Sequence, residues 1–259
     1  MTGHVIAIVS CILCVALLGH AEAARAKHVR LRTAHGPVHV WTPARYDATT
    51  AGVVVYVHGF YTGVDRAWRK HHLARQFAAS GINALFIACE APRNGRHPVQ
   101  WPRLGELLDT VAADLGHALP AGPVIAVGHS GAHRTLSLWL AEDRIDTIVL
   151  VDALFSEAAP FRDWLAADPH RRLIDVAADT RRWTDALHAE LPETVVFDRF
   201  PSARVGRLRG ARKARVVYVH SQIDHMSLVT GGVALPMLLR AVRLPVVVNA
   251  SRKAPIRVR

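Results

Sequence analysis

The pentapeptide at 128–132 (Gly-His-Ser-Gly-Ala) places a hydroxyl between small residues, in a setting that predicts nucleophilic chemistry. It follows an apolar run, 123–127, that predicts a buried strand, and it leads into helical spacing over 132–140. A turn this tight strains the backbone of its serine, so the residues two before and two after must be small. The first is glycine, and the second is Ala132 where a second glycine is usual. The sequence therefore predicts a nucleophile elbow that exposes the Ser130 hydroxyl.

A second pair of residues follows another apolar strand earlier in the chain. The β-branched run 53–57 predicts a strand buried on both faces, as in a parallel sheet. It ends in His58-Gly59. Taken alone, this dipeptide is equally a strand end followed by a turn glycine.

Together, the elbow and His58-Gly59 resemble the α/β-hydrolase superfamily, in which a His-Gly loop follows the third strand. The resemblance covers about residues 28 to 245. It implies an oxyanion hole formed by the backbone N–H of Phe60 or Tyr61 together with that of Gly131. Two fixed donors stabilise the negative charge that acyl transfer develops on the carbonyl oxygen.

A serine hydroxyl needs a neighbouring imidazole to accept its proton at neutral pH. Among the 16 histidines of the chain, His225 lies just beyond the expected strand 216–220 and before the last helix. The hydrolase family has its catalytic histidine at that position. His220 is the competitor, but the last residue of a strand is expected to be packed or hydrogen-bonded. We therefore predict His225 as the base.

Two aspartates compete to be the acid that orients this base. Asp152 directly follows the apolar strand 145–151, where an unpartnered carboxylate would pay a desolvation penalty. Asp179 follows the next strand, where most α/β-hydrolases carry the acid, whereas a minority carry it one strand earlier. Asp152 would also serve as a helix N-cap. We predict Asp152, with Asp179 as the alternative.

Other acidic residues at this sheet edge are given no catalytic role. Asp175 would point into the sheet packing from a strand at 173–177. Glu90 and Asp65 fall in loops, where salt bridges to Arg66 or Arg93 account for them.

Alternating strands and helices along the chain predict right-handed crossovers and a mostly parallel sheet with helices on both faces. The expected strands are 29–32 and 38–41 as a hairpin, then 53–57, 82–88, 123–127, 145–151, 173–177 and 216–220. The expected helices are 66–79, 101–119, 132–140, 161–167, 182–191 and 227–242. The basic segment 192–214 is expected to be irregular, as a small lid or a surface loop, and no insertion is long enough for a large cap domain.

The 259 residues, 51% of them hydrophobic, fit one large domain over 27–245. An apolar run at 5–18 followed by small residues predicts a signal peptide over 1–26, cleaved after Ala23 or Ala26. The protein is then secreted or periplasmic, and an uncleaved N-terminal membrane anchor is the alternative. Residues 246–259 form a basic tail.

The net charge of +11 comes mainly from arginine and would attract anionic surfaces, although arginine richness also follows from genome composition. We find no helix-turn-helix, zinc finger or aromatic-basic platform, so no nucleic-acid partner is expected. Cleavage of the leader would leave Cys89 as the one cysteine, a small core residue. No metal site and no cofactor are predicted.

These residues predict a serine hydrolase of the carboxylesterase kind, acting on a small-molecule or lipid-like ester through an acyl-enzyme on Ser130. An amidase or peptidase would use the same residues, because both reactions pass through a tetrahedral species. A non-catalytic binding protein with the same fold is the alternative from another class.

Overall fold

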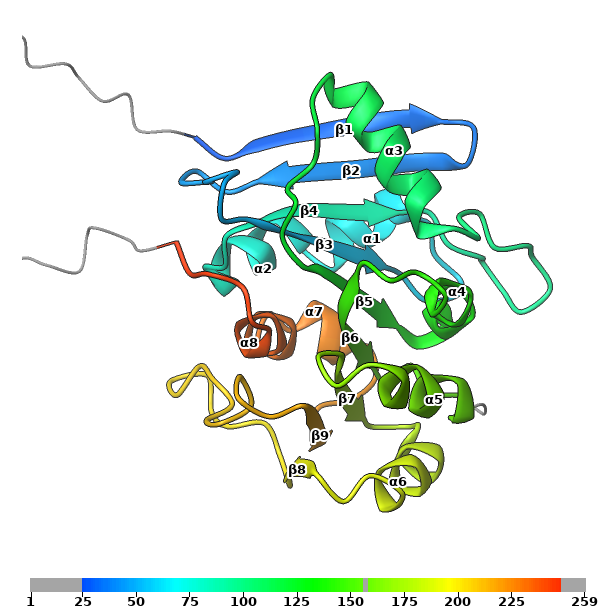
Figure 1. Ribbon diagram of the computed structural model, residues 1–259, viewed down its shortest axis with the longest axis vertical. Helices are drawn as coiled ribbons and strands as arrows, with labels where there is room; N and C mark the ends of the chain where they lie inside the picture. Colours follow the sequence, from blue (N-terminus) through cyan, green and yellow to red (C-terminus); the bar gives the residue numbers. More distant parts are fainter. Residues whose placement is uncertain (1–24, 156–157, 248–259) are drawn as a thin grey trace, which may run out of the picture.

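The computed structural model describes residues 25–155 and 158–247, and these form a nine-stranded sheet with helices on both faces (Figure 1). The strand order is β1-β2-β4-β3-β5-β6-β7-β9-β8. The strands are β1 (Lys27–Thr33), β2 (Gly36–Thr42), β3 (Gly52–Val57), β4 (Ala84–Cys89), β5 (Val124–His129), β6 (Ile145–Val151), β7 (Arg172–Ala177), β8 (Thr194–Phe197) and β9 (Val216–His220). The helices are α1 (Val64–Lys70), α2 (Leu73–Ser80), α3 (Leu104–Leu115), α4 (His133–Trp139), α5 (Ala159–Ala167), α6 (Arg181–Ala189), α7 (Ser227–Thr230) and α8 (Ala234–Ala241), with a 3₁₀ turn η1 (Ser130–Ala132).

The sheet is mostly parallel, as predicted. β1 and β2 form the opening hairpin, in a register that places Leu31 opposite Val38. β2 is also antiparallel to β4, and the other pairs of described strands are parallel. Every residue of β3, β4, β5 and β7 is buried, which explains their continuous apolar sequences.

Two layers of helices bury the two faces of this sheet. Helices α3 to α6 cover one face, and α1, α2, α7 and α8 cover the other (Figure 1). Trp101 and Trp139 are fully buried on the first face, and Phe77 and Leu235 on the second. The layers leave the carboxyl ends of β5, β6, β7 and β9 at one edge, where the candidate site lies.

Two helices expected to be continuous are each divided in two. The segment 66–79 forms α1 and α2, because His72 adopts a left-handed conformation with φ of 48°. The segment 227–242 forms α7 and α8, separated at Gly232, whose φ is +73°. In both places, a left-handed residue interrupts the helical hydrogen-bond ladder.

The segment 192–214 is not wholly irregular, because it contains the strand β8. This strand pairs in parallel with β9 at the outer edge of the sheet. Val195 and Val196 are 40% and 49% exposed, so β8 lacks the buried apolar run that identifies the inner strands. Turns and bends follow it up to β9, and the described residues form no large cap domain.

Two predictions lie largely outside the described residues. These are the signal peptide, with cleavage after Ala23 or Ala26, and the basic tail over 246–259. The secreted or periplasmic location therefore stays a prediction. Within the described part of the chain, no helix is both long enough and apolar enough to cross a membrane.

A buried arginine connects the second helical layer to the sheet. Arg172 begins β7, is fully buried, and donates hydrogen bonds to the carbonyl oxygens of Ala211 and Ala214 at 2.9 Å and of Ala241 at 3.3 Å. Burial lowers the pKa of Arg172 to about 10, so the guanidinium remains charged at neutral pH. This one side chain thus holds the loop before β9 and the end of α8 on β7.

We expect Arg172→Met to lower the free energy of unfolding by at least about 2 kcal/mol. The reason is that buried carbonyl oxygens left without a donor cost about 1–3 kcal/mol each. Urea denaturation measures the change. The matched control, Arg207→Met, removes an exposed arginine from the same loop and should change stability by less than about 0.5 kcal/mol. Equal losses in the two variants would contradict the assigned role.

Candidate active site

The segment from β5 to α4 makes the tight turn that the sequence predicts. Ser130 has a φ of 55°, a left-handed conformation that non-glycine residues rarely adopt. A Cβ atom added at Gly128 would lie 2.5 Å from Leu136 Cδ1 and 3.1 Å from Ala132 Cβ. The requirement for small residues around the serine is therefore a direct steric one, and alanine meets it at the second position.

The His-Gly loop after β3 packs directly against this turn. A Cβ atom at Gly59 would lie 2.8 Å from Ser130 Cβ, so only glycine allows the loop to approach. The fully buried ring of His58 donates from Nδ1 to the Gly59 carbonyl oxygen at 2.7 Å. Its Nε2 accepts the N–H of Ala91 at 3.1 Å. These two hydrogen bonds fix the tautomer of His58 and tie the loop to the end of β4.

One of the predicted oxyanion donors is engaged elsewhere. The N–H of Tyr61 donates to the Arg93 carbonyl oxygen at 2.8 Å, and Tyr61 has a φ of 61°. Tyr61 is therefore the wrong donor, because a neighbouring loop holds its amide. The N–H of Phe60 has no partner in the described part of the chain, and Gly131 lies in the first turn of a helix, where amides lack intrahelical partners. The Phe60 ring packs on Gly131, where a Cβ atom would approach within 2.4 Å.

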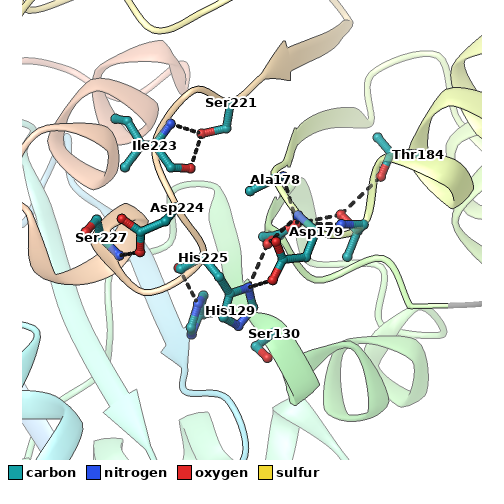
Figure 2. Close-up of polar contacts among 12 residues, drawn as sticks. His129, Ser130, Ala178, Asp179, Thr184, Ser221, Ile223, Asp224, His225 and Ser227 are labelled. Atoms are coloured by element: carbon teal, nitrogen blue, oxygen red, sulfur yellow. Dashed lines mark hydrogen bonds and ion pairs between the residues drawn. The ribbon is translucent and has the colours of Figure 1, made fainter.

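The structure brings His225 and Asp152 together. His225 Nδ1 lies 2.6 Å from Asp152 Oδ2. The carboxylate is fully buried and also accepts the N–H groups of Ala178, Asp179 and Thr180 at 2.9–3.1 Å and the Thr180 hydroxyl at 2.7 Å. Figure 2 labels three of its partners, Ala178, Asp179 and His225, beside the end of β7. Asp152 receives the amide and hydroxyl donors from the loop before α6.

These contacts set the charge state of both groups. Burial alone would raise the pKa of Asp152, but hydrogen bonds from His225, Thr180 and the loop amides outweigh it and hold the pKa well below its ordinary value. The carboxylate in turn raises the pKa of His225 above its ordinary value of 6.5, against the opposing effect of burial. Asp152 is therefore ionised, and it favours a proton on the imidazole.

The competing residues are farther from His225 or have other partners. Asp179 Oδ2 is 4.0 Å from His225 Nδ1, and its side chain is 69% exposed. His220 Nε2 is 3.9 Å from Asp185 on α6, away from Ser130. Asp175 is fully buried within the sheet, where burial raises its pKa, and it faces His188 at 3.6 Å.

Three groups at this edge have the spacing of a metal site. One ligand atom each from Asp152, Asp179 and His225 lie within 4.8 Å of one another. However, both oxygens of Asp152 already accept hydrogen bonds, and Nδ1 of His225 is one of their donors. Nε2 of His225 and the carboxylate of Asp179 keep open lone pairs, but the contacts that are formed are those of an acid–imidazole pair.

Ser130 and His225 line one cavity of about 650 Å³. In Figure 2, the Ser130 side chain lies beside the His225 ring. No hydrogen bond between these two described residues is present in this structure. Catalytic hydrogen bonds are commonly long in a free enzyme and shorten when substrate binds, so the arrangement is compatible with proton transfer.

Two further histidines in this cavity were not predicted. His129 is buried and donates from Nε2 to the His225 carbonyl oxygen at 3.2 Å, with the ring centroids of the two 4.6 Å apart. Burial, helped by the neighbouring imidazoles, lowers the pKa of His129 to about 3 and that of His71 to about 4. Both rings are therefore neutral. The sequence does place His129 directly before the serine, which could have marked it as a site residue. Its hydrogen bond to His225, however, joins residues far apart in the chain, and the sequence does not indicate it.

The loop carboxylates have structural partners. Asp65 pairs with Arg30 at 2.6 Å, so the expectation of Arg66 as its partner was wrong. Glu90 accepts the N–H of Val64 at the start of α1 and lies 3.8 Å from Arg93. Cys89 is buried, and burial raises the pKa of its thiol.

Comparison with known proteins identifies the fold. No protein-family model and no curated protein matches the sequence. A mutant feruloyl esterase module from Clostridium thermocellum, in complex with sinapinate, has a TM-score of 0.55 at 10% identity, over 83% of this chain and 87% of that chain. An S-formylglutathione hydrolase from Agrobacterium tumefaciens has a TM-score of 0.52 at 11% identity, over 85% of this chain and 95% of that chain. A fluorophosphonate-binding serine hydrolase from Staphylococcus aureus has a TM-score of 0.53 at 10% identity, over 83% of this chain and 96% of that chain. The chain has the α/β-hydrolase fold, as the resemblance implied.

We expect His225 to titrate above 6.5, and we expect its pKa to fall in Asp152→Asn, because that variant removes the charge that favours the imidazolium. In the matched variant Asp179→Asn, which alters an exposed and more distant carboxylate, the change should be smaller. NMR titration of the imidazole C2–H resonance, assigned with His225→Gln, measures both. A larger change in Asp179→Asn would transfer the orienting role to that residue.

Proposed function

We propose that the protein is a serine hydrolase that cleaves carboxylic esters. Ser130 is its nucleophile, His225 its general base and Asp152 the acid that orients the base. The observation that carries this proposal is the contact of 2.6 Å between His225 Nδ1 and the buried Asp152, beside a cavity that also exposes Ser130 at a strained turn. Nucleophile, base and orienting group in this arrangement are the elements of a catalytic triad.

In the acylation step, Ser130 Oγ attacks the ester carbonyl carbon while Nε2 of His225 accepts the hydroxyl proton. The carbonyl electron pair moves to the oxygen, and the N–H groups of Phe60 and Gly131 stabilise the negative charge. When the tetrahedral intermediate collapses, the bond to the alcohol oxygen breaks and His225 gives that oxygen the proton. Water then attacks the acyl-enzyme by the same route and releases the acid and free Ser130.

Asp152 keeps the proton of neutral His225 on Nδ1, which leaves Nε2 free to accept one from Ser130. As the imidazolium forms, the ionised carboxylate stabilises its positive charge. The five donors around Asp152 hold the carboxylate in place, so little reorganisation accompanies the proton transfer.

The comparisons support ester cleavage over amide cleavage. The structural neighbours include a feruloyl esterase and an S-formylglutathione hydrolase, whose names specify cleavage of an ester and of a thioester. Identities of 10–11% support the fold directly and the activity only by analogy. The cavity volume of about 650 Å³ also suits a small-molecule ester.

We expect a fluorophosphonate probe to form one covalent adduct on Ser130 in the folded protein, because only an activated serine reacts at neutral pH. Peptide mass spectrometry locates the adduct. Ser130→Ala should lose the adduct and the turnover of 4-nitrophenyl acetate, while its melting temperature stays within a few degrees, since no core contact is removed. Absence of labelling in folded wild-type protein would overturn the proposal, and retained turnover in Ser130→Ala would mean another nucleophile.

We expect Asp152→Asn to lower kcat by about 10³- to 10⁴-fold, as the equivalent change does in the serine-protease triad, because the asparagine favours the wrong imidazole tautomer. Asp179→Asn should lower kcat by less than about tenfold, since it removes no interaction that forms in the transition state. Steady-state kinetics of both variants on one ester provide the comparison. The reverse ranking would assign the acid to the strand after β6, and two modest losses would mean that either carboxylate orients His225.

A further inference from the structure

The cavity beside Ser130 carries positive charge without a matching negative charge. Two permanently charged side chains line it, Arg66 and Lys70, and none of the described residues that line it is acidic. Its other lining groups include neutral imidazoles and the side chains of Phe60, Tyr61 and Met226. A bound substrate therefore meets cations and apolar groups next to the nucleophile.

Both cations project from one side of α1. Arg66 and Lys70 are four residues apart, a spacing that places them on the same helix face. Neither forms an ion pair or a hydrogen bond with any residue in the described ranges, although both lie beside the proposed nucleophile. Their charges are free to bind a ligand.

The adjoining cavity, of about 580 Å³, provides an internal comparison. Arg66 borders it too, with Arg69 and Arg93, but Asp65 and Glu90 also line it. Those acids hold nearby groups, since Asp65 pairs with Arg30 and Glu90 lies near Arg93. Two carboxylates therefore partly offset the arginines there, whereas no described carboxylate lines the cavity that contains Ser130.

The deeper histidines do not change this balance. Burial keeps His71 and His129 neutral at physiological pH, so they offer hydrogen-bonding nitrogens and no charge. The permanent positive charge at the cavity comes from Arg66 and Lys70, whereas the ionised Asp152 lies behind His225 and does not line the cavity. The net charge of +11 adds to the positive field. Such a field raises the local concentration of anions and speeds their association.

We propose that the substrate is an ester that carries an anionic group, and that Arg66 and Lys70 bind this group while Ser130 attacks the ester carbonyl. The inference rests on the proposed function. A guanidinium binds a carboxylate or phosphate oxygen pair through two parallel hydrogen bonds, and an ammonium adds a mobile point charge. Arg66 and Lys70 are thus specificity-determining residues, and the preferred esters are acidic ones.

Two pairs of matched esters test this assignment. The anion lies in the acyl part of mono-4-nitrophenyl succinate, with 4-nitrophenyl butyrate as its neutral partner. It lies in the alcohol part of 4-acetoxybenzoate, with 4-acetoxytoluene as partner. For each pair, the readout is the ratio of kcat/KM for the anionic ester to that for the neutral one.

We expect Arg66→Gln and Lys70→Gln each to lower this ratio by about tenfold in at least one pair, mainly through KM, because a charge-assisted hydrogen bond is lost. High salt should lower the wild-type ratio by screening. Arg69→Gln is the matched control, since it removes an exposed arginine of the same helix that does not line this cavity, and it should leave the ratio unchanged. Equal ratios in both pairs for wild type, Arg66→Gln and Lys70→Gln would overturn the inference.

A binding measurement separates this result from failure of the proposed chemistry. In the Ser130→Ala background, calorimetry should show tighter binding of the succinate ester or of 4-acetoxybenzoate than of its neutral partner, and Arg66→Gln/Lys70→Gln should abolish that preference. If the fluorophosphonate labels Ser130 but no preference for anionic esters is found, this inference is overturned and the proposed hydrolase function stands. If Ser130 is not labelled but anionic esters bind more tightly, the proposed hydrolase function is overturned and the anion site stands.

Discussion

The carboxylate of Asp152 connects three segments that are remote in sequence, and the geometry of the site depends on it. It projects from the end of β6, accepts three amides and a hydroxyl from the loop between β7 and α6, and contacts His225 before α7. An isolated buried carboxylate would be strongly unfavourable, so the full set of donors is what allows it to remain charged. The same donors orient it, which makes the position of His225 a consequence of how β6, β7 and β9 are ordered in the sheet.

Two neighbouring strand ends that carry residues of the candidate site have a strained backbone. Ser130 follows β5 with a φ of 55°, and Asp152 follows β6 with a φ of 48°. Left-handed conformations of this kind cost about 1–3 kcal/mol each and persist only where surrounding packing enforces them. Close contacts enforce the first, because Gly59 and Gly128 leave no room for the turn to relax. Hydrogen bonds enforce the second, since a different backbone angle at Asp152 would withdraw its carboxylate from the loop amides.

The features that the sequence could predict are those in which neighbours along the chain determine the outcome. The inner strands are continuous apolar runs, and Ser130, Asp152 and His225 each follow such a strand, so parallel pairing alone brings them to one edge. The predictions that the structure corrects concern residues whose partners are distant in the chain, or an edge strand that lacks the buried apolar run of the inner strands. The amide of Tyr61 bonds to a loop after another strand, and the edge strand β8 exposes its valines. Nothing local in the sequence indicates such contacts, because they are set by which loops the folded sheet places side by side.

The imidazoles around Ser130 share a cavity but differ in proton affinity, because they differ in their partners. His225 contacts an ionised carboxylate, which raises its pKa, whereas His129 and His71 are buried without one, which lowers theirs. His225 therefore has the highest proton affinity of the three. The uncharged pair adds packing and one hydrogen bond to the backbone of His225 without competing for the serine proton. Among the described lining residues, the permanent positive charges both come from α1, so the proposed proton transfer and the proposed anion binding would use separate groups.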